Sequence, residues 1–146
     1  MTSITPQLPT TVRVFGQLLS STRRGARLAR LLAVAQLQAW EVSPSVTDRA
    51  AQIVAELAAN AALHGRVRGR DFKLVLALDP RAGALRIAVS DARGEALPVA
   101  AEEGPPGEAE SGRGLCIVTA LADRWGTQPY GCGGKTVWAE LETARA

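Results

Sequence analysis

Apolar residues recur along the chain with two different periods, and these periods predict its elements. Alternation predicts strands over residues 12–19, 72–78, 84–90 and 136–141. Apolar positions three and four apart predict helices over 23–40, over 44–63 and from 115 to about 125. A turn with proline and glycine, residues 79–83, joins the second and third strands as a hairpin.

The second helix carries polar side chains near its C-terminal end. Glu56, Asn60 and His64 recur every four residues in a run of Ala and Leu, so they share one helix face with a drift of about 40° at each step. Burying these groups without partners costs a few kcal/mol each. The stripe is therefore expected to face a ligand, a metal or a wet cleft, with a solvated outer face as the alternative.

Three further features follow the third strand. Asp91 stands at the strand's end with Gly94 three residues on, which suits either a ligand pocket or a simple Asx turn. Residues 95–111 are rich in Pro, Gly and Glu without periodicity and predict a long, mobile loop. The segment 112–115, Gly-Arg-Gly-Leu, then opens the third helix, where backbone N–H groups and the helix dipole favour an anion.

The bulk composition is that of one globular domain: 146 residues, 47% hydrophobic and 21% charged. We expect a flexible leader over 1–11, the domain over 12–141 and a short tail over 142–146. The sequence contains neither a signal peptide nor an apolar run of membrane-spanning length, so the expected location is cytoplasmic. Cys116 and Cys132 are expected to be free thiols.

A net charge of +3 and a pI near 9.4 admit nucleic acid as a partner. The arginines at 23, 27 and 30 share a helix face, but aromatic residues make up only 4% of the chain and offer little for base stacking. A basic nucleic-acid adaptor is therefore a minor alternative. The segment 131–136, Gly-Cys-Gly-Gly-Lys-Thr, imitates the end of a P-loop, but Pro129 stands where the first glycine is required and the segment enters a strand.

The order of these motifs resembles the ATP-binding domain of the GHKL superfamily, shared by DNA gyrase, heat-shock chaperone ATPases, sensor histidine kinases and MutL. Residues 56–65 are similar to its N box, 91–94 to its first glycine box and 112–115 to its second. The resemblance covers about residues 12–141. The short chain and the segments 121–126 and 135–138 look most like the stand-alone anti-sigma-factor serine kinases of the RsbW type, including related actinobacterial regulators.

This resemblance implies a two-layer α/β (α+β) sandwich of the Bergerat type, with three main helices on one face of a mixed, mostly antiparallel sheet of four or five strands. It implies ATP and Mg2+ as cofactors. Asn60 would hold the metal, and Asp91, supported by Thr136, would accept a hydrogen bond from the adenine amino group. Further residues placed around the nucleotide are Gly94, Gly112, Arg113, Gly114 and Leu115. Glu56, one turn before Asn60, is placed to act as general base.

The implied function is an ATP-binding regulator that sequesters a protein partner, such as a sigma factor, and phosphorylates a serine or threonine of an antagonist protein. Direct contact with nucleic acid or membrane is not expected, and the second sheet face is a candidate for homodimer formation. The alternative is a non-catalytic module whose partner-binding surface depends on ATP or ADP. Arg93 and the acidic, proline-rich loop depart from the family pattern and favour the module, whereas Glu56 favours the enzyme. His64 is left between a structural role at the helix end and a phosphate contact.

Overall fold

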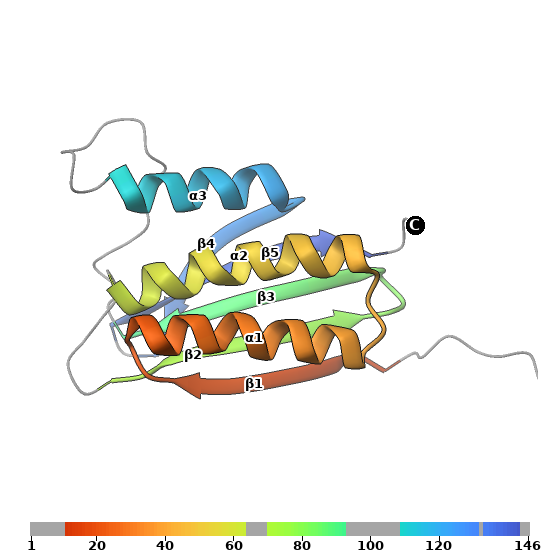
Figure 1. Ribbon diagram of the computed structural model, residues 1–146, viewed down its shortest axis with the longest axis horizontal. Helices are drawn as coiled ribbons and strands as arrows, with labels where there is room; N and C mark the ends of the chain where they lie inside the picture. The colour runs from red at the N-terminus through yellow and green to blue at the C-terminus, as the bar shows by residue number, and fades with distance from the viewer. Residues whose placement is uncertain (1–10, 64–69, 93–108, 132, 144–146) are drawn as a thin grey trace, which may run out of the picture.

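The computed structural model describes residues 11–63, 70–92, 109–131 and 133–143, and for 109–114 it describes the backbone alone. In these residues a five-stranded sheet is covered on one face by three helices, which confirms the predicted two-layer sandwich (Figure 1). In chain order the elements are β1 (Arg13–Leu19), α1 (Arg23–Ala39), α2 (Pro44–Leu63), β2 (Phe72–Asp79), β3 (Ala84–Asp91), α3 (Ala109–Leu121), β4 (Arg124–Tyr130) and β5 (Gly134–Glu142).

The strands lie in the order β1-β2-β3-β5-β4, and all four pairings are antiparallel. The prediction of a mixed sheet was therefore wrong in that detail for the described strands. The β2–β3 and β4–β5 pairs are hairpins, and α3 carries the chain across so that β5 runs antiparallel to β3. This arrangement brings the end of β3 and the start of β5 together.

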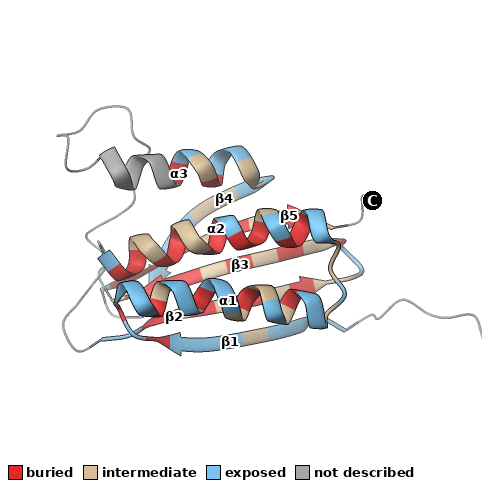
Figure 2. Cartoon of the chain, in the orientation of Figure 1, coloured by how far each residue is buried: buried red, intermediate tan, exposed pale blue. Residues whose placement is uncertain are grey.

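The core lies between the sheet and the helices. Alternate residues of β2, namely Phe72, Leu74, Leu76 and Leu78, are buried under the helical layer (Figure 2). The buried faces of α1 and α2 are rich in alanine, whose small side chain lets helices lie close to each other and to the sheet. α2 buries more of its surface than α1 and lies over the middle of the sheet. Its position therefore depends on packing along its whole length.

Both long helices begin at the hydroxyl caps that their sequences favour. The Thr22 hydroxyl accepts a hydrogen bond from the Gly25 N–H at 3.0 Å, and the Ser43 hydroxyl accepts one from the Val46 N–H at 3.4 Å. Each cap satisfies a donor that has no partner inside its helix. Among the described residues, the helices are too short or too polar to cross a membrane.

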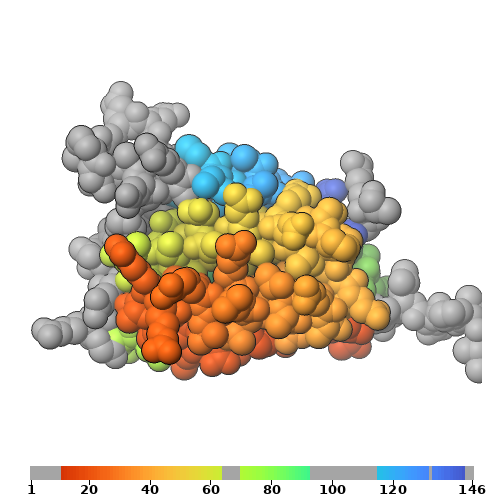
Figure 3. All heavy atoms as spheres, in the orientation of Figure 1, coloured from red at the N-terminus to blue at the C-terminus, as the bar shows by residue number. Residues whose placement is uncertain are grey.

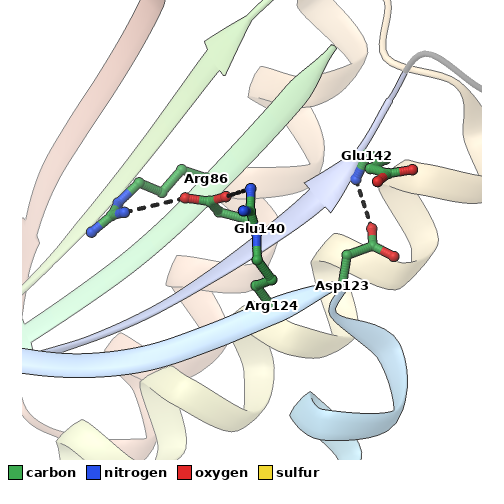
Figure 4. Close-up of polar contacts among 5 residues, drawn as sticks. All are labelled: Arg86, Asp123, Arg124, Glu140 and Glu142. Carbon is green, nitrogen blue, oxygen red and sulfur yellow. Dashed lines mark hydrogen bonds and ion pairs between the residues drawn. The ribbon is translucent and has the colours of Figure 1, made fainter. Parts of the chain in front are cut away.

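The second sheet face carries a network of charged side chains. Glu140 on β5 accepts from Arg86 at 3.3 Å and from Arg124 at 2.7 Å (Figure 4). The Arg86 guanidinium also lies 4.6 Å from the centroid of the Trp138 ring, within the range of a cation–π contact. The Arg86 side chain thus lies over Trp138 on the face that the helices leave open.

The C-terminal third differs most from the sequence prediction. We expected the third helix to continue to about Trp125, but α3 ends at Leu121 and Trp125 lies in β4. The backbone of Asp123 donates to the Glu140 carbonyl at 2.9 Å, and its carboxylate accepts from the Glu142 N–H at 2.7 Å. These bonds turn the chain from the helix into an edge strand, which tolerates Pro129 because one side of the strand needs no partner.

Substitution of Gly25 tests how closely the start of α1 packs against the backbone of Ser20. A methyl group at Gly25 would overlap the backbone carbonyl of Ser20, which cannot swing away as a side chain can. We expect Gly25→Ala to lower the free energy of unfolding by about 2–3 kcal/mol in urea denaturation. Gly16→Ala is the matched control, since its nearest new contact is a lysine carbon at 3.7 Å. Equal stability of the two variants would contradict the packing described at Ser20.

Candidate functional site

The end of β3 that bears Asp91, the C-terminal end of α2 and the N-terminal end of α3 lie at one end of the sandwich (Figure 1). Ser90, next to the end of β3, pairs with Lys73 at the start of β2, and β2 is the strand that follows α2 in the chain. Asp91 therefore lies at the end of the sheet where α2 ends. α3 runs beside α2 in the opposite direction, so the C-terminal half of α2 lies alongside the N-terminal half of α3 (Figure 1).

Glu56 and Asn60 are half-buried on α2, while Leu57 and Ala61 beside them are buried. Arg49 lies two turns before Glu56 on the same side, and its guanidinium donates to the Leu121 carbonyl at the end of α3 at 2.6 Å. The face that bears Glu56 and Asn60 is therefore turned toward α3. The amide oxygen of Asn60 suits a hard cation such as Mg2+, and its partial exposure leaves it accessible to one. His64 lies outside the described residues.

Asp91 is buried with 4% of its surface exposed, and Lys135 is buried beside it. The Lys135 ammonium lies 3.1 Å from one Asp91 carboxylate oxygen and 3.0 Å from the other. The two residues are direct cross-strand partners of β3 and β5. Both continue the core-facing alternation of their strands, after Val89 on β3 and before Val137 on β5. The pair therefore projects into the layer between sheet and helices.

Lys135 is the site residue that sequence analysis missed. Lysine is almost never fully buried unless it is paired. Here it occupies the first core-facing position of a strand whose later core-facing residues are Val137, Ala139 and Leu141. That lysine at a core position was the available signal, but its partner depends on the β3–β5 register, which sequence periodicity does not provide.

Thr136 lies one residue further on and therefore on the opposite face of the sheet from Asp91. Its hydroxyl shares a buried hydrogen bond of 2.6 Å with the hydroxyl of Ser90. This contact joins β3 to β5 directly behind the Asp91–Lys135 pair. The structure thus places Thr136 as a support for the strands that carry Asp91, and its predicted role at adenine stays a prediction.

The glycines before Lys135 form a tight turn. Gly131 and Gly133 have positive φ angles of 56° and 82°, which favour glycine. A methyl group at Gly134 would lie 2.6 Å from the Asp91 carbonyl oxygen, so only glycine allows β5 to approach β3 this closely. The resemblance of this segment to a P-loop is therefore explained by a hairpin turn.

The predicted phosphate segment is displaced relative to its helix. α3 begins at Ala109, so Gly112, Arg113 and Gly114 lie within the helix, where we had expected them to precede it. The N–H groups without a partner inside a helix belong to its first turn, which ends before Gly114. Leu115 is buried with 1% exposure. Gly94, Arg93 and residues 95–108 of the predicted loop lie outside the described residues.

A second surface lies on the outer side of α1. Leu28 and Leu31 are exposed by 45% and 67%, in a helix that contains four arginines and no acidic residue. The atoms of α1, orange in Figure 3, form much of the lower part of the face in view. The arginines are Arg23, Arg24, Arg27 and Arg30. Positive side chains near a helix N-terminus oppose the helix dipole. This arrangement does not stabilise the isolated helix, and it leaves an apolar surface within a positive field.

Comparison with known proteins identifies the fold independently. Residues 19–141 match the family model of the histidine kinase-like ATPase domain. The structure of the RsbU and RsbW domains of Rv1364c from Mycobacterium tuberculosis is similar, with a TM-score of 0.69 and 20% identity over 92% of this chain and 33% of that chain. The present chain thus spans about a third of that longer one. A chain of the SiaB–SiaC complex from Pseudomonas aeruginosa is similar with a TM-score of 0.63 and 12% identity, over 87% and 88% of the two chains. None of the curated proteins matches. These matches confirm the predicted superfamily and fold.

Lys135→Met tests the buried pair. It removes the ammonium from a buried carboxylate, and breaking such a pair typically costs about 3–5 kcal/mol. We expect urea denaturation to show a loss at the lower end of that range, because methionine keeps the apolar stem. Arg124→Met is the matched control, since Arg124 pairs with Glu140 at the surface and pairs of that kind contribute about 0–1 kcal/mol. A loss at Lys135 no larger than that at Arg124 would show that the buried pair does not stabilise the fold.

Proposed function

Because the chain belongs to the histidine kinase-like ATPase domain family, we propose that it binds ATP with Mg2+ and acts as an anti-sigma-factor-type serine/threonine protein kinase. It would sequester a protein partner and phosphorylate an antagonist of that complex. One observation carries the proposal. The buried carboxylate of Asp91 projects toward the helix-covered side of the sheet, and the half-buried pair Glu56 and Asn60 lies in the C-terminal half of α2, the helix that ends at the same end of the sandwich.

Each residue would have a separate task. The Asp91 carboxylate accepts a hydrogen bond from the adenine amino group, and the Ser90–Thr136 bond holds its strand in place. Asn60 supplies an oxygen to Mg2+, which when bound neutralises charge on the phosphates. The phosphates would lie toward the N-terminal end of α3. Gly112, Gly114 and Arg113 are the residues proposed to contact the phosphates, and Gly94 and Leu115 are proposed to lie around the nucleotide.

Glu56 is the proposed general base. It precedes Asn60 by one helical turn and faces the same side of α2. A serine or threonine hydroxyl that attacks the γ-phosphate must lose its proton, and a carboxylate within hydrogen-bonding reach accepts it. Glu56 is half-buried on α2, so part of its side chain remains exposed to a substrate.

The outer surface of α1 supports the protein-binding part of the proposal. Exposed Leu28 and Leu31 provide apolar contact area, and the surrounding arginines favour an acidic partner surface. The similar structure from Pseudomonas aeruginosa is itself a chain of a two-protein complex. A protein partner therefore fits this surface better than a small molecule does.

A second candidate function is a non-catalytic module that binds ATP or ADP and displays a partner-binding surface without phosphate transfer. The position of α3 favours it, because Gly112 and Gly114 lie inside the helix and their backbone is committed to helical geometry. Both candidates require nucleotide at Asp91. They differ in whether the phosphate end of the site supports chemistry.

Nucleotide binding is tested by calorimetry with and without Mg2+. The wild type should bind ATP, and Asp91→Asn should weaken binding at least about tenfold, because a neutral amide oxygen is a weaker acceptor than a carboxylate oxygen. Asn60→Ala should weaken binding only when Mg2+ is present. Arg81→Ala, in the exposed β2–β3 turn, is the control that should bind as the wild type does. Absence of ATP binding by the wild type would overturn the proposed function.

Phosphate transfer is tested with labelled γ-phosphate and a cognate antagonist protein. We expect Glu56→Ala to slow transfer by about 100- to 10,000-fold, since general bases contribute in that range. ATP affinity should stay close to that of the wild type. Undiminished transfer by Glu56→Ala would refute the assignment of the base. A wild type that binds ATP and antagonist but transfers no phosphate would establish the non-catalytic module.

A further inference from the structure

β1 is an edge strand with few of the features that usually protect such an edge. It lies at one end of the sheet order, and in the described part of the chain no strand pairs with its outer side (Figure 1). Its seven residues contain one charge and no proline, and they all pair in register with β2 without a bulge. Natural edge strands are usually protected by lysine, proline, bulges or a short length. β1 is therefore a template for another strand.

Two large apolar side chains of β1 project into solvent. Phe15 and Leu19 face the core, so Val14 and Leu18, at alternate positions, face the side of the sheet that the helices leave open. Val14 is 65% exposed and Leu18 is 60% exposed. Most of the strand is exposed (Figure 2). Gly16 lies between the two side chains on the same face, so β1 carries an apolar stripe beside its outer backbone edge.

A carbonyl of β1 accepts a hydrogen bond from outside the sheet. The Leu18 carbonyl accepts from the side-chain amide of Gln17 at 3.1 Å, and this donor is not part of β2. Because backbone groups alternate in direction along an antiparallel strand, Val14 and Gly16 direct their backbone groups to the same side as Leu18. A strand that replaced the Gln17 amide would pair with all three residues.

The order of these residues is complementary to itself. A two-fold axis at Gly16 places a second β1 antiparallel to the first, with Val14 of each copy opposite Leu18 of the other. Each exposed side chain then gains an apolar partner at cross-strand distance. Two-fold contacts are also the commonest way in which identical chains associate. We propose that two copies of this chain pair through β1 in this register and join their two sheets into one continuous sheet.

The other described surfaces fit a second copy less well. On the open sheet face, Glu140 pairs with Arg86 and Arg124, and packing two such faces together would remove these charges from water. Two α1 helices would repel each other, because each carries four arginines and no acidic residue. The opposite edge strand, β4, contains Pro129, which has no N–H group to donate. Pairing of β1 with β1 leaves all these groups in water and closes after two copies.

Sedimentation velocity without nucleotide tests the dimer. Two seven-residue strands form a small interface, so we expect a reversible dimer that is populated at about 10–100 µM protein. Val14→Lys combined with Leu18→Lys places lysine opposite lysine and should weaken association at least about tenfold. Leu31→Lys on α1 is the matched control, because Leu31 is 67% exposed, and this variant should associate as the wild type does. Circular dichroism establishes that each variant is folded.

A second double variant tests the register. Val14→Lys combined with Leu18→Glu places lysine opposite glutamate on both sides of the axis only when the axis lies at Gly16. This variant should dimerise at least about tenfold more tightly than the lysine double variant, and added salt should reduce the difference. Val14→Glu combined with Leu18→Glu controls for net charge. It lowers the positive charge of the chain but sets like charges opposite each other, so it should associate as weakly as the lysine double variant does.

The remaining outcomes would overturn the inference. β1 is not the interface if the wild type stays monomeric up to about 500 µM, or if the lysine double variant dimerises as tightly as the wild type. Loss of the dimer in Ala88→Lys, which lies in the middle of the open sheet face, with the dimer kept in the β1 variants would show that two sheets pack face to face. If the lysine–glutamate variant associates no more tightly than the lysine variant, the proposed register is wrong. The inference does not rest on the proposed function, because none of these measurements involves nucleotide.

Discussion

The ion pair between Asp91 and Lys135 constrains the strands that carry it. Two charges removed from water are stable only when they stay in close contact, so β3 and β5 must keep the register that places these residues opposite each other. A slip of one residue would turn one of the side chains to the other sheet face. The hairpin glycines, the Ser90–Thr136 bond and the antiparallel crossover all serve this register.

Because successive residues of a strand point to opposite faces, the two sheet faces carry different sets of charged side chains. The core-facing side holds the charged pair beneath the helical layer, while the open side carries the Arg86–Glu140–Arg124 network over Trp138. The same strands therefore combine a buried ion pair with a more exposed polar surface. The buried pair should contribute more to the free energy of unfolding than the surface network does, because only the buried pair is shielded from water.

The sequence predicted those parts of the structure that local periodicity encodes. α2 and the β2–β3 hairpin have strong patterns, and their residues end close to the predicted bounds. β4 was missed because Arg124–Tyr130 contains glycine, proline and polar residues, and is a strand through its pairing with β5. For the candidate site, the sequence proposes Glu56, Asn60 and Asp91 as single positions, and their roles stay predictions. Lys135 was missed because its partner lies 44 residues away and is fixed by sheet register.

The two ends of the candidate site are built by different kinds of packing. Asp91 and Lys135 depend on hydrogen-bonded strand register, whereas Glu56 and Asn60 depend on how α2 lies against α3. The Arg49–Leu121 contact joins these helices at the end far from Asn60, so it sets their approach without occupying the site. The residues proposed for the base and those proposed for phosphate transfer therefore belong to separate parts of the fold. If the proposed function holds, a change in the α2–α3 contact would affect phosphate transfer and leave the β3–β5 register intact.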